Sequence, residues 1–153
     1  MLHFDIRKIE SQFLNIQMSL SEGRRQQNEL QLGATQCKTA VELVDRWIRI
    51  KDELLKLHAE AESKSNAGMQ NQIEILKQHE METVEALQKY LSGEKIDDAE
   101  FRNKDRDSLI NLRMEFIARQ RRYIAARDSW VDRCRKMEMA LTQVQAQRSE
   151  QNL

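Results

Sequence analysis

The sequence predicts an all-α protein, built as an elongated antiparallel coiled coil or three-helix bundle with two long helices. Three observations lead to this fold class. The 153 residues contain no proline and only four glycines, so little in the chain interrupts a helix. Hydrophobic residues make up 40% of the chain, which is too large a share for a disordered protein. They also recur at alternating steps of four and three, the spacing of a coiled-coil seam.

One uninterrupted heptad pattern predicts a first helix over residues 2–62. Alternating steps of four and three from Leu2 place mostly apolar residues on a single seam of this helix. The seam positions are Leu2, Ile6, Ile9, Phe13, Ile16, Leu20, Gly23, Gln27, Leu30, Ala34, Cys37, Val41, Val44, Ile48, Lys51, Leu55 and His58. At 1.5 Å per residue, such a helix extends for roughly 90 Å.

Gly23 and Gly33 argue against a continuous first helix. Each costs about 1 kcal/mol in a helix interior, and a turn at Gly33 would convert the fold into a four-helix bundle. A turn would normally shift the heptad phase, yet the phase is the same on both sides of Gly33. We therefore expect one helix, with its weakest part between Gly23 and Ala34.

Helix-breaking residues predict where the chain turns. A turn is expected at residues 63–68, where serine, asparagine and glycine cluster. A second helix follows over about residues 69–91, and a second turn occupies residues 92–97. The apolar residues of the second helix lie roughly on one face: Met69, Ile73, Leu76, Val84, Leu87 and Leu91.

Residues around Asp97 predict the start of a third helix, from about 98 to 150. Asp97 as N-cap and Glu100 form an acidic capping box, and Ile96 and Phe101 are placed as a hydrophobic staple. Adjacent apolar pairs then recur every seven residues, giving a face broad enough for two neighbours. The apolar positions are Leu109/Ile110, Phe116/Ile117, Tyr123/Ile124 and Trp130/Val131, followed by Met137, Leu141 and Val144. The three helices form a single predicted domain, residues 1–153.

The candidate partner-binding residues all lie on the third helix. Polar seam positions separate its apolar pairs, and their long stems can lie along an interface while their heads reach carboxylates or water. Tyr123 and Trp130, from the apolar pairs themselves, complete the predicted set. The set is Arg113, Gln120, Tyr123, Arg127 and Trp130.

The same helix carries the one locally basic region of the sequence, from Arg119 to Arg135. Basic residues with interleaved aromatics could bind phosphates. However, Glu115, Asp128 and Asp132 lie within one or two turns of these cations. We therefore expect a solvated face that pairs with acidic residues of another helix.

Helix lengths predict that the chain associates with another protein. The second helix is about half as long as its neighbours and cannot cover either of them completely. Apolar seam would then be exposed at the free ends of the long helices, and such surface normally binds another chain. A homodimer or a hetero-complex is expected.

Composition argues against other partners and against membrane insertion. Twenty-five basic and twenty-five acidic residues cancel, so no global field favours nucleic acid or an anionic membrane. No apolar run approaches the roughly 18 residues that cross a bilayer. The first residues lack the basic-then-apolar order of a signal peptide, so the expected location is the cytoplasm.

The sequence also argues against an enzyme and against a cofactor or metal site. Neither His58 nor His79 belongs to a Glu-x-x-His pair, which a di-iron bundle requires. Cys37 and Cys134 lack CxxC spacing and fall on apolar stripes, so they are expected to be buried hydrophobes. No glycine-rich phosphate loop is present.

The leading functional hypothesis is a non-enzymatic adaptor, chaperone or stalk within a larger protein assembly. In general layout the chain is similar to the stalk proteins of bacterial flagellar and type III export ATPases, which have two long antiparallel helices. This similarity is of class, and no specific motif is shared. The alternative hypothesis is a helical dimer that binds a membrane surface or nucleic acid, which would require a long basic face.

Overall fold

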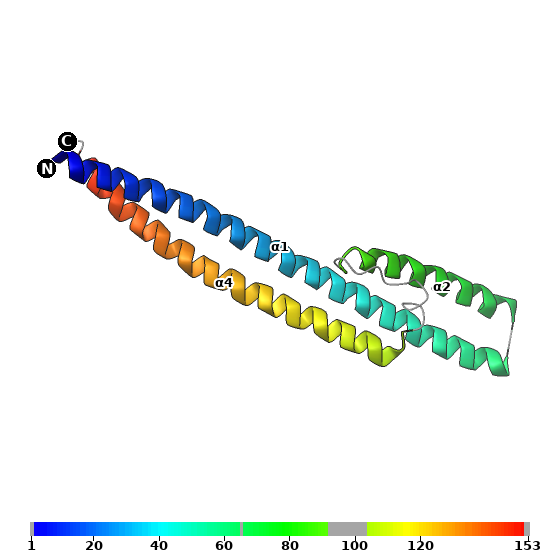
Figure 1. Cartoon of the computed structure of the whole chain (residues 1–153). Coiled ribbons are helices and arrows are strands. Elements are labelled where there is room, and N and C mark those ends of the chain that lie inside the picture. Colours follow the sequence, from blue (N-terminus) through cyan, green and yellow to red (C-terminus); the bar gives the residue numbers. More distant parts are fainter. Residues whose placement is uncertain (1, 65, 92–103, 152–153) are drawn as a thin grey trace. The chain divides into compact units, whose positions relative to one another are not determined.

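The computed structural model describes residues 2–64, 66–91 and 104–151, and within them it contains three α-helices and no strand. The helices are α1 (Leu2–Ser63), α2 (Ala67–Gln88) and α4 (Arg106–Gln151), as Figure 1 shows. The predicted all-α class is therefore confirmed. None of the described helices carries an apolar stretch long enough to cross a membrane.

The chain divides into two compact units. The first unit contains Met1–Ala34 and Arg121–Leu153, so it combines the first part of α1 with the last part of α4. The second unit is Thr35–Gln120, which contains the rest of α1, all of α2 and the start of α4. Each unit has its own set of contacts between helices.

In the first unit, polar pairs connect α1 to α4 in opposite order along the two helices. Arg148 Nε donates to Glu10 Oε1 (2.7 Å), and its guanidinium lies 3.9 Å from the centre of the Phe13 ring. Further along α1, Arg24 pairs with Glu138 at 3.1 Å. Residue numbers therefore rise along α1 as they fall along α4. The buried residues between the two helices are Leu20, Gly23, Ala34, Cys134 and Val144.

Helix α1 continues through Gly23 and Gly33, so the alternative of a four-helix bundle is wrong. The physical reason is close packing against α4. A Cβ atom on Gly33 would lie 2.8 Å from Cε1 of Tyr123, and one on Gly23 would lie 3.0 Å from Sγ of Cys134. The glycines thus give Tyr123 and Cys134 room to approach the α1 backbone.

In the second unit, α1 presents two heptad seams. The predicted seam continues here as Cys37, Val41, Val44 and Ile48, flanked by acidic residues that pair with α4. Asp45 accepts a hydrogen bond from Arg113 Nε (2.6 Å), and Asp52 forms an ion pair with Arg106 Nε (3.1 Å). A second seam, also in alternating steps, faces α2: Ala40, Leu43, Trp47, Ile50, Leu54 and Leu57.

The predicted single seam is wrong at its end, because Leu55 is 64% exposed and His58 is also exposed. The described part of α4 pairs with Asp52 through Arg106, its first helical residue, so it does not extend along α1 to these positions. Beyond Asp52, α1 buries its second seam against α2 instead. Ile50, Leu54 and Ile73 form that core.

The ends of α2 lie close to the predicted turns. Asn66 is the N-cap, with its side-chain oxygen accepting a hydrogen bond from the Met69 N–H at 2.8 Å. At the other end, Tyr90 N–H donates to the Leu87 carbonyl at 3.0 Å and tightens the last turn. The helix spans 22 residues and buries Ile73, Thr83, Val84 and Leu87.

Helix α4 begins later than predicted. Lys104 and Asp105 are not helical, so a helix running unbroken from residue 98 is wrong. Asp105 is the cap: its Oδ1 accepts from the Ser108 backbone N–H at 2.8 Å. The predicted capping box and staple (residues 96–101) lie outside the described residues.

The Asp105 cap makes the stability of α4 depend on pH. The hydrogen bonds from Ser108 lower the pKa of the Asp105 carboxyl in the folded state. The cap therefore contributes fully to stability above the unfolded-state pKa near 4, and its contribution is lost as pH falls through the lower folded-state pKa.

As the pH is lowered, we expect the melting temperature of the native protein to fall relative to that of the Asp105→Asn variant. Asparagine keeps a capping oxygen but does not titrate. Circular dichroism melts at several acidic pH values test this, with Asp107→Asn as control. If the difference in melting temperature between the native protein and Asp105→Asn does not change with pH, Asp105 is not the cap.

Candidate functional site

The structure places the predicted partner-binding residues in contacts within the chain. Arg113 binds Asp45 in the second unit, where Gln120 is half-buried. In the first unit, Arg127 Nη1 donates to Gln31 Oε1 at 2.5 Å, and two other nitrogens of its guanidinium donate to Asp128. These residues stabilise helix pairing, and binding of a partner by any of them stays a prediction.

The two aromatic members of the predicted set also pack against α1. Tyr123 lies against Gly33, and Trp130 lies 3.5 Å from the Cβ position of Gly23. Trp130 in turn supports Arg133, whose guanidinium lies 4.7 Å from the Trp130 ring centre. The predicted set is thus distributed over both units.

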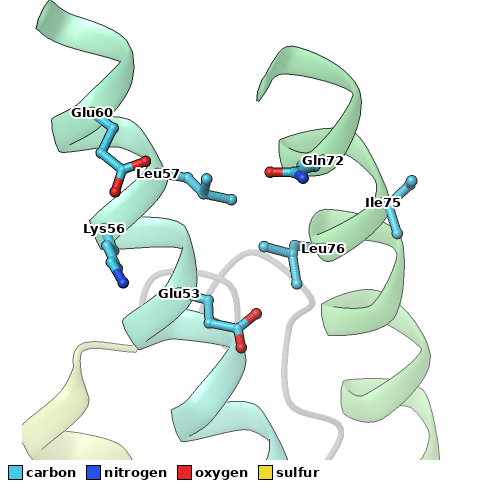
Figure 2. A pocket seen from close by; sticks show the side chains of 7 residues that line it. All are labelled: Glu53, Lys56, Leu57, Glu60, Gln72, Ile75 and Leu76. Atoms are coloured by element: carbon cyan, nitrogen blue, oxygen red, sulfur yellow. The ribbon is translucent and has the colours of Figure 1, made fainter. Parts of the chain in front are cut away.

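One groove lies in the second unit, between the end of α1 and the start of α2. We call it the α1–α2 groove. It has a volume of about 440 Å³ and is open to solvent. The residues that line it are Glu53, Lys56, Leu57, Glu60, Gln72, Ile75 and Leu76. Figure 2 shows Leu57 and Leu76 reaching toward each other from the two helices, so that they form an apolar floor.

The floor of this groove is an extension of the core between α1 and α2. Leu57 is the last position of the second α1 seam, and both Leu57 and Leu76 pack against the buried cluster of Ile50, Leu54 and Ile73. Beside them, Ile75 is 48% exposed. Apolar surface that is continuous with a core and open to solvent is typical of a site that another protein covers.

Charged residues of α1 border the α1–α2 groove. Glu53, Lys56 and Glu60 follow one another at steps of three and four, so they lie along one side of the helix. None of the three forms an ion pair with another described residue. Their charges therefore face solvent at the edge of an apolar floor, where they could select a partner by charge.

A second groove lies in the first unit, between α1 and α4, and we call it the α1–α4 groove. It has a volume of about 390 Å³. The residues that line it are Asn15, Ile16 and Ser19 of α1 with Lys136, Met137 and Ala140 of α4. Among the described residues that line it, only Lys136 is charged.

The most buried polar cluster of the described residues joins α1 to α2. Trp47 Nε1–H donates to Glu80 Oε2 at 3.2 Å, and Lys51 Nζ lies 3.5 Å from the same oxygen. The Lys51 and Glu80 side chains are only 19% and 14% exposed. A half-buried ion pair of this kind fixes the register of two helices, because displacing either helix would leave a charge unpaired.

Metal-binding geometry is not found among the residues that the structure describes. No three histidine, cysteine, aspartate or glutamate side chains there converge as a ligand set. Cys37 and Cys134 are both buried, in agreement with their predicted place on apolar stripes. Among the surface features that the structure describes, the two grooves are candidates for binding a ligand.

Comparison with protein-family models, curated proteins and solved structures found no match. The two grooves and the charges around them are the features that bear on the function of the chain.

The residues of the α1–α2 groove were not among the predicted site residues. A signal was present, because residues 40, 43, 47, 50, 54 and 57 repeat in alternating steps of three and four. This second repeat shows that α1 packs against two helices. It does not show which of its residues remain open to solvent.

Proposed function

We propose that the chain is a non-enzymatic coiled-coil module that binds other proteins, as an adaptor or scaffold subunit. The observation that carries this proposal is the α1–α2 groove, with its core-like floor of Leu57 and Leu76 open to solvent. The opposite order of the contacts between α1 and α4 supports an antiparallel coiled coil as the frame of the module.

The shape of the groove favours a helical segment of a partner over a small molecule. Its walls are two helices and its face is open, whereas small-molecule sites enclose most of the ligand surface. An amphipathic helix can place an apolar ridge on Leu57, Leu76 and Ile75 and become the third member of a local bundle. Glu53 and Glu60, seven residues apart, would then lie beside one edge of that helix.

Site-specific photo-crosslinking tests this proposal. A benzophenone amino acid at Gln72, inside the groove, is expected to crosslink one defined protein in cells that produce the chain. The same group at Asn71 is the matched control, because Asn71 is exposed but does not line the groove. Adding Leu76→Lys should abolish the crosslink from Gln72, because it places a charge on the apolar floor.

The experiment tests separately whether a protein binds the chain and whether it binds in the α1–α2 groove. Crosslinking that is the same from Gln72 and Asn71, or that survives Leu76→Lys, would show that the groove is not the binding site. Absence of any crosslinked protein would count against the interaction itself. Circular dichroism melts of each variant establish that a lost crosslink is not caused by unfolding.

A further inference from the structure

The α1–α4 groove of the first unit is bordered on α4 by one continuous line of residues. Lys136 and Ala140 line the groove. Residues three or four positions apart share one side of a helix, so the same side can be followed from Lys136 toward the N-terminus of α4. The positions on this line are Arg122, Ala126, Ser129, Arg133, Lys136 and Ala140. We call this line the basic edge.

The six positions of the basic edge carry three cations and no carboxylate, and Asp132 flanks the edge one turn before Lys136. Arg122, Arg133 and Lys136 are all exposed, and none forms an ion pair with a described residue. Arg133 is held in place by stacking on Trp130. Three cations on one side of a helix, without internal partners, attract an anionic ligand.

The α1 side of the same groove adds little negative charge. Asn15 and Ser19 are its polar lining residues. One further turn along this side of α1 lies Glu22, whose carboxylate already accepts hydrogen bonds from Arg25 and Gln26. These hydrogen bonds, with Arg25 the largest cause, lower the pKa of Glu22 to about 2. The Glu22 carboxylate is therefore engaged locally by Arg25, which also pairs with Glu29 at 2.6 Å.

The groove between these two sides has an apolar floor. Ile16 and Met137 are half-buried there, and Ala140 leaves space for an approaching side chain. A ligand that fits this surface needs an apolar stripe for the floor and carboxylates for the basic edge. These are the features of an acidic amphipathic helix.

We propose that the α1–α4 groove is a second protein-binding site, which takes an acidic amphipathic helix from a partner protein. This site is separate from the α1–α2 groove and does not depend on the function proposed for that groove. Nucleic acid fits less well, because single strands require exposed aromatic platforms, and here the face of Trp130 is covered by Arg133. An anionic membrane would need a longer cluster of cations than these three.

A labelled synthetic peptide tests the proposal by fluorescence anisotropy. The probe is a helical peptide of about 18 residues, long enough to follow the basic edge, with a leucine stripe flanked by glutamates. The comparison peptide has lysines in place of the glutamates. We expect the whole chain to bind the glutamate peptide, and Arg133→Glu combined with Lys136→Glu to weaken this binding about tenfold or more.

A matched pair of substitutions controls for net charge. Arg121 and Arg135 are exposed on a neighbouring face of α4, which also carries Asp128, and Asp132 lies between this face and the basic edge. Arg121→Glu combined with Arg135→Glu changes the net charge equally. It should alter the affinity by only about a factor of two in physiological salt, because exposed charges away from the contact are screened.

Three kinds of result would overturn the proposal. One is equal weakening by both pairs of substitutions, which would indicate general attraction to a basic helix. Another is equal or tighter binding of the lysine peptide, or no binding of either peptide. The third is tighter binding of a short DNA duplex, or of phosphatidylcholine–phosphatidylserine vesicles, that is lost in the Arg133/Lys136 variant. None of these results bears on crosslinking from Gln72, so the two proposals fail separately.

Discussion

Replacing Trp47 with alanine is expected to lower the free energy of unfolding by about 3–5 kcal/mol, the usual cost of removing a buried tryptophan from a core. Trp47 is 0% exposed and is the largest fully buried side chain of the described residues. It lies on the α1 seam that faces α2, and its indole N–H donates to Glu80. The substitution therefore removes packing and a hydrogen bond to a half-buried carboxylate together. Urea denaturation followed by circular dichroism measures the loss.

Trp47→Phe separates these two contributions. It keeps most of the apolar volume but removes the N–H donor, while Lys51 still neutralises Glu80. We expect a smaller loss of about 1.5–3 kcal/mol, as for other hydrogen bonds to charged groups. If Trp47→Phe and Trp47→Ala lower the free energy of unfolding equally, the hydrogen bond to Glu80 contributes more than the packing of the indole ring. A loss below about 1 kcal/mol for Trp47→Ala would contradict the burial of this residue.

Gly33→Ala is expected to destabilise the protein although alanine favours helices. Alanine gains about 1 kcal/mol over glycine in a helix interior. Its Cβ, however, would lie 2.8 Å from Cε1 and 2.9 Å from Cδ1 of Tyr123, and overpacking of this kind costs about 1–3 kcal/mol. The ring must move or the helices must separate, so a net loss of about 1 kcal/mol is expected in thermal or urea unfolding.

A double-mutant cycle with Tyr123→Ala gives the sharper measurement. Without the ring, Gly33→Ala should stabilise the protein by about 1 kcal/mol, because only the helix preference remains. The sign of the effect therefore reverses, with a coupling energy of about 2 kcal/mol. The same effect of Gly33→Ala in both backgrounds would show that Tyr123 does not pack on Gly33. Gly33→Ala that stabilises both proteins would show that the α1 backbone is not in close contact with α4.

The sequence was most informative where one periodic pattern dominates. Absence of proline and a constant heptad phase predicted a helix that passes through Gly33, and α1 does so. The apolar pairs of α4 predicted a broad buried face, and Leu109 and Phe116 are among the most buried residues. These features depend on local spacing, which a single sequence records directly.

Features that depend on where another helix ends were not predictable. Leu55 continues the heptad pattern perfectly, yet it is exposed because the described part of α4 starts opposite Asp52. The start of α4 itself was misplaced, because several aspartates in residues 97–107 could serve as the cap and only the structure selects Asp105. The role of the two glycines also required knowledge of which α4 side chains face them.

The candidate site was hidden for the same reason. Leu57 and Leu76 are ordinary seam residues in the sequence, and a groove exists there because two helices meet with no third described helix on that side. In contrast, the predicted partner-binding residues Arg113 and Arg127 have long side chains that suit an interface. In the structure they make contacts within the chain, to Asp45 and Gln31. A residue type that suits an interface does not show which interface it serves.

The first unit combines two segments that are far apart in the sequence, and this affects the order of folding. Its cross-helix hydrogen bonds join residues 138 positions apart at Glu10 and Arg148, whereas Trp47 and Glu80 are 33 positions apart. Closing the longer loop costs more conformational entropy and makes pairing slower. The α1–α2 pair can therefore form while the ribosome is still extending the chain, but residues 1–34 must wait for those beyond Arg121. During this interval Phe13, Ile16 and Leu20 have no α4 neighbours. The nascent chain is then most prone to aggregate or to bind a chaperone.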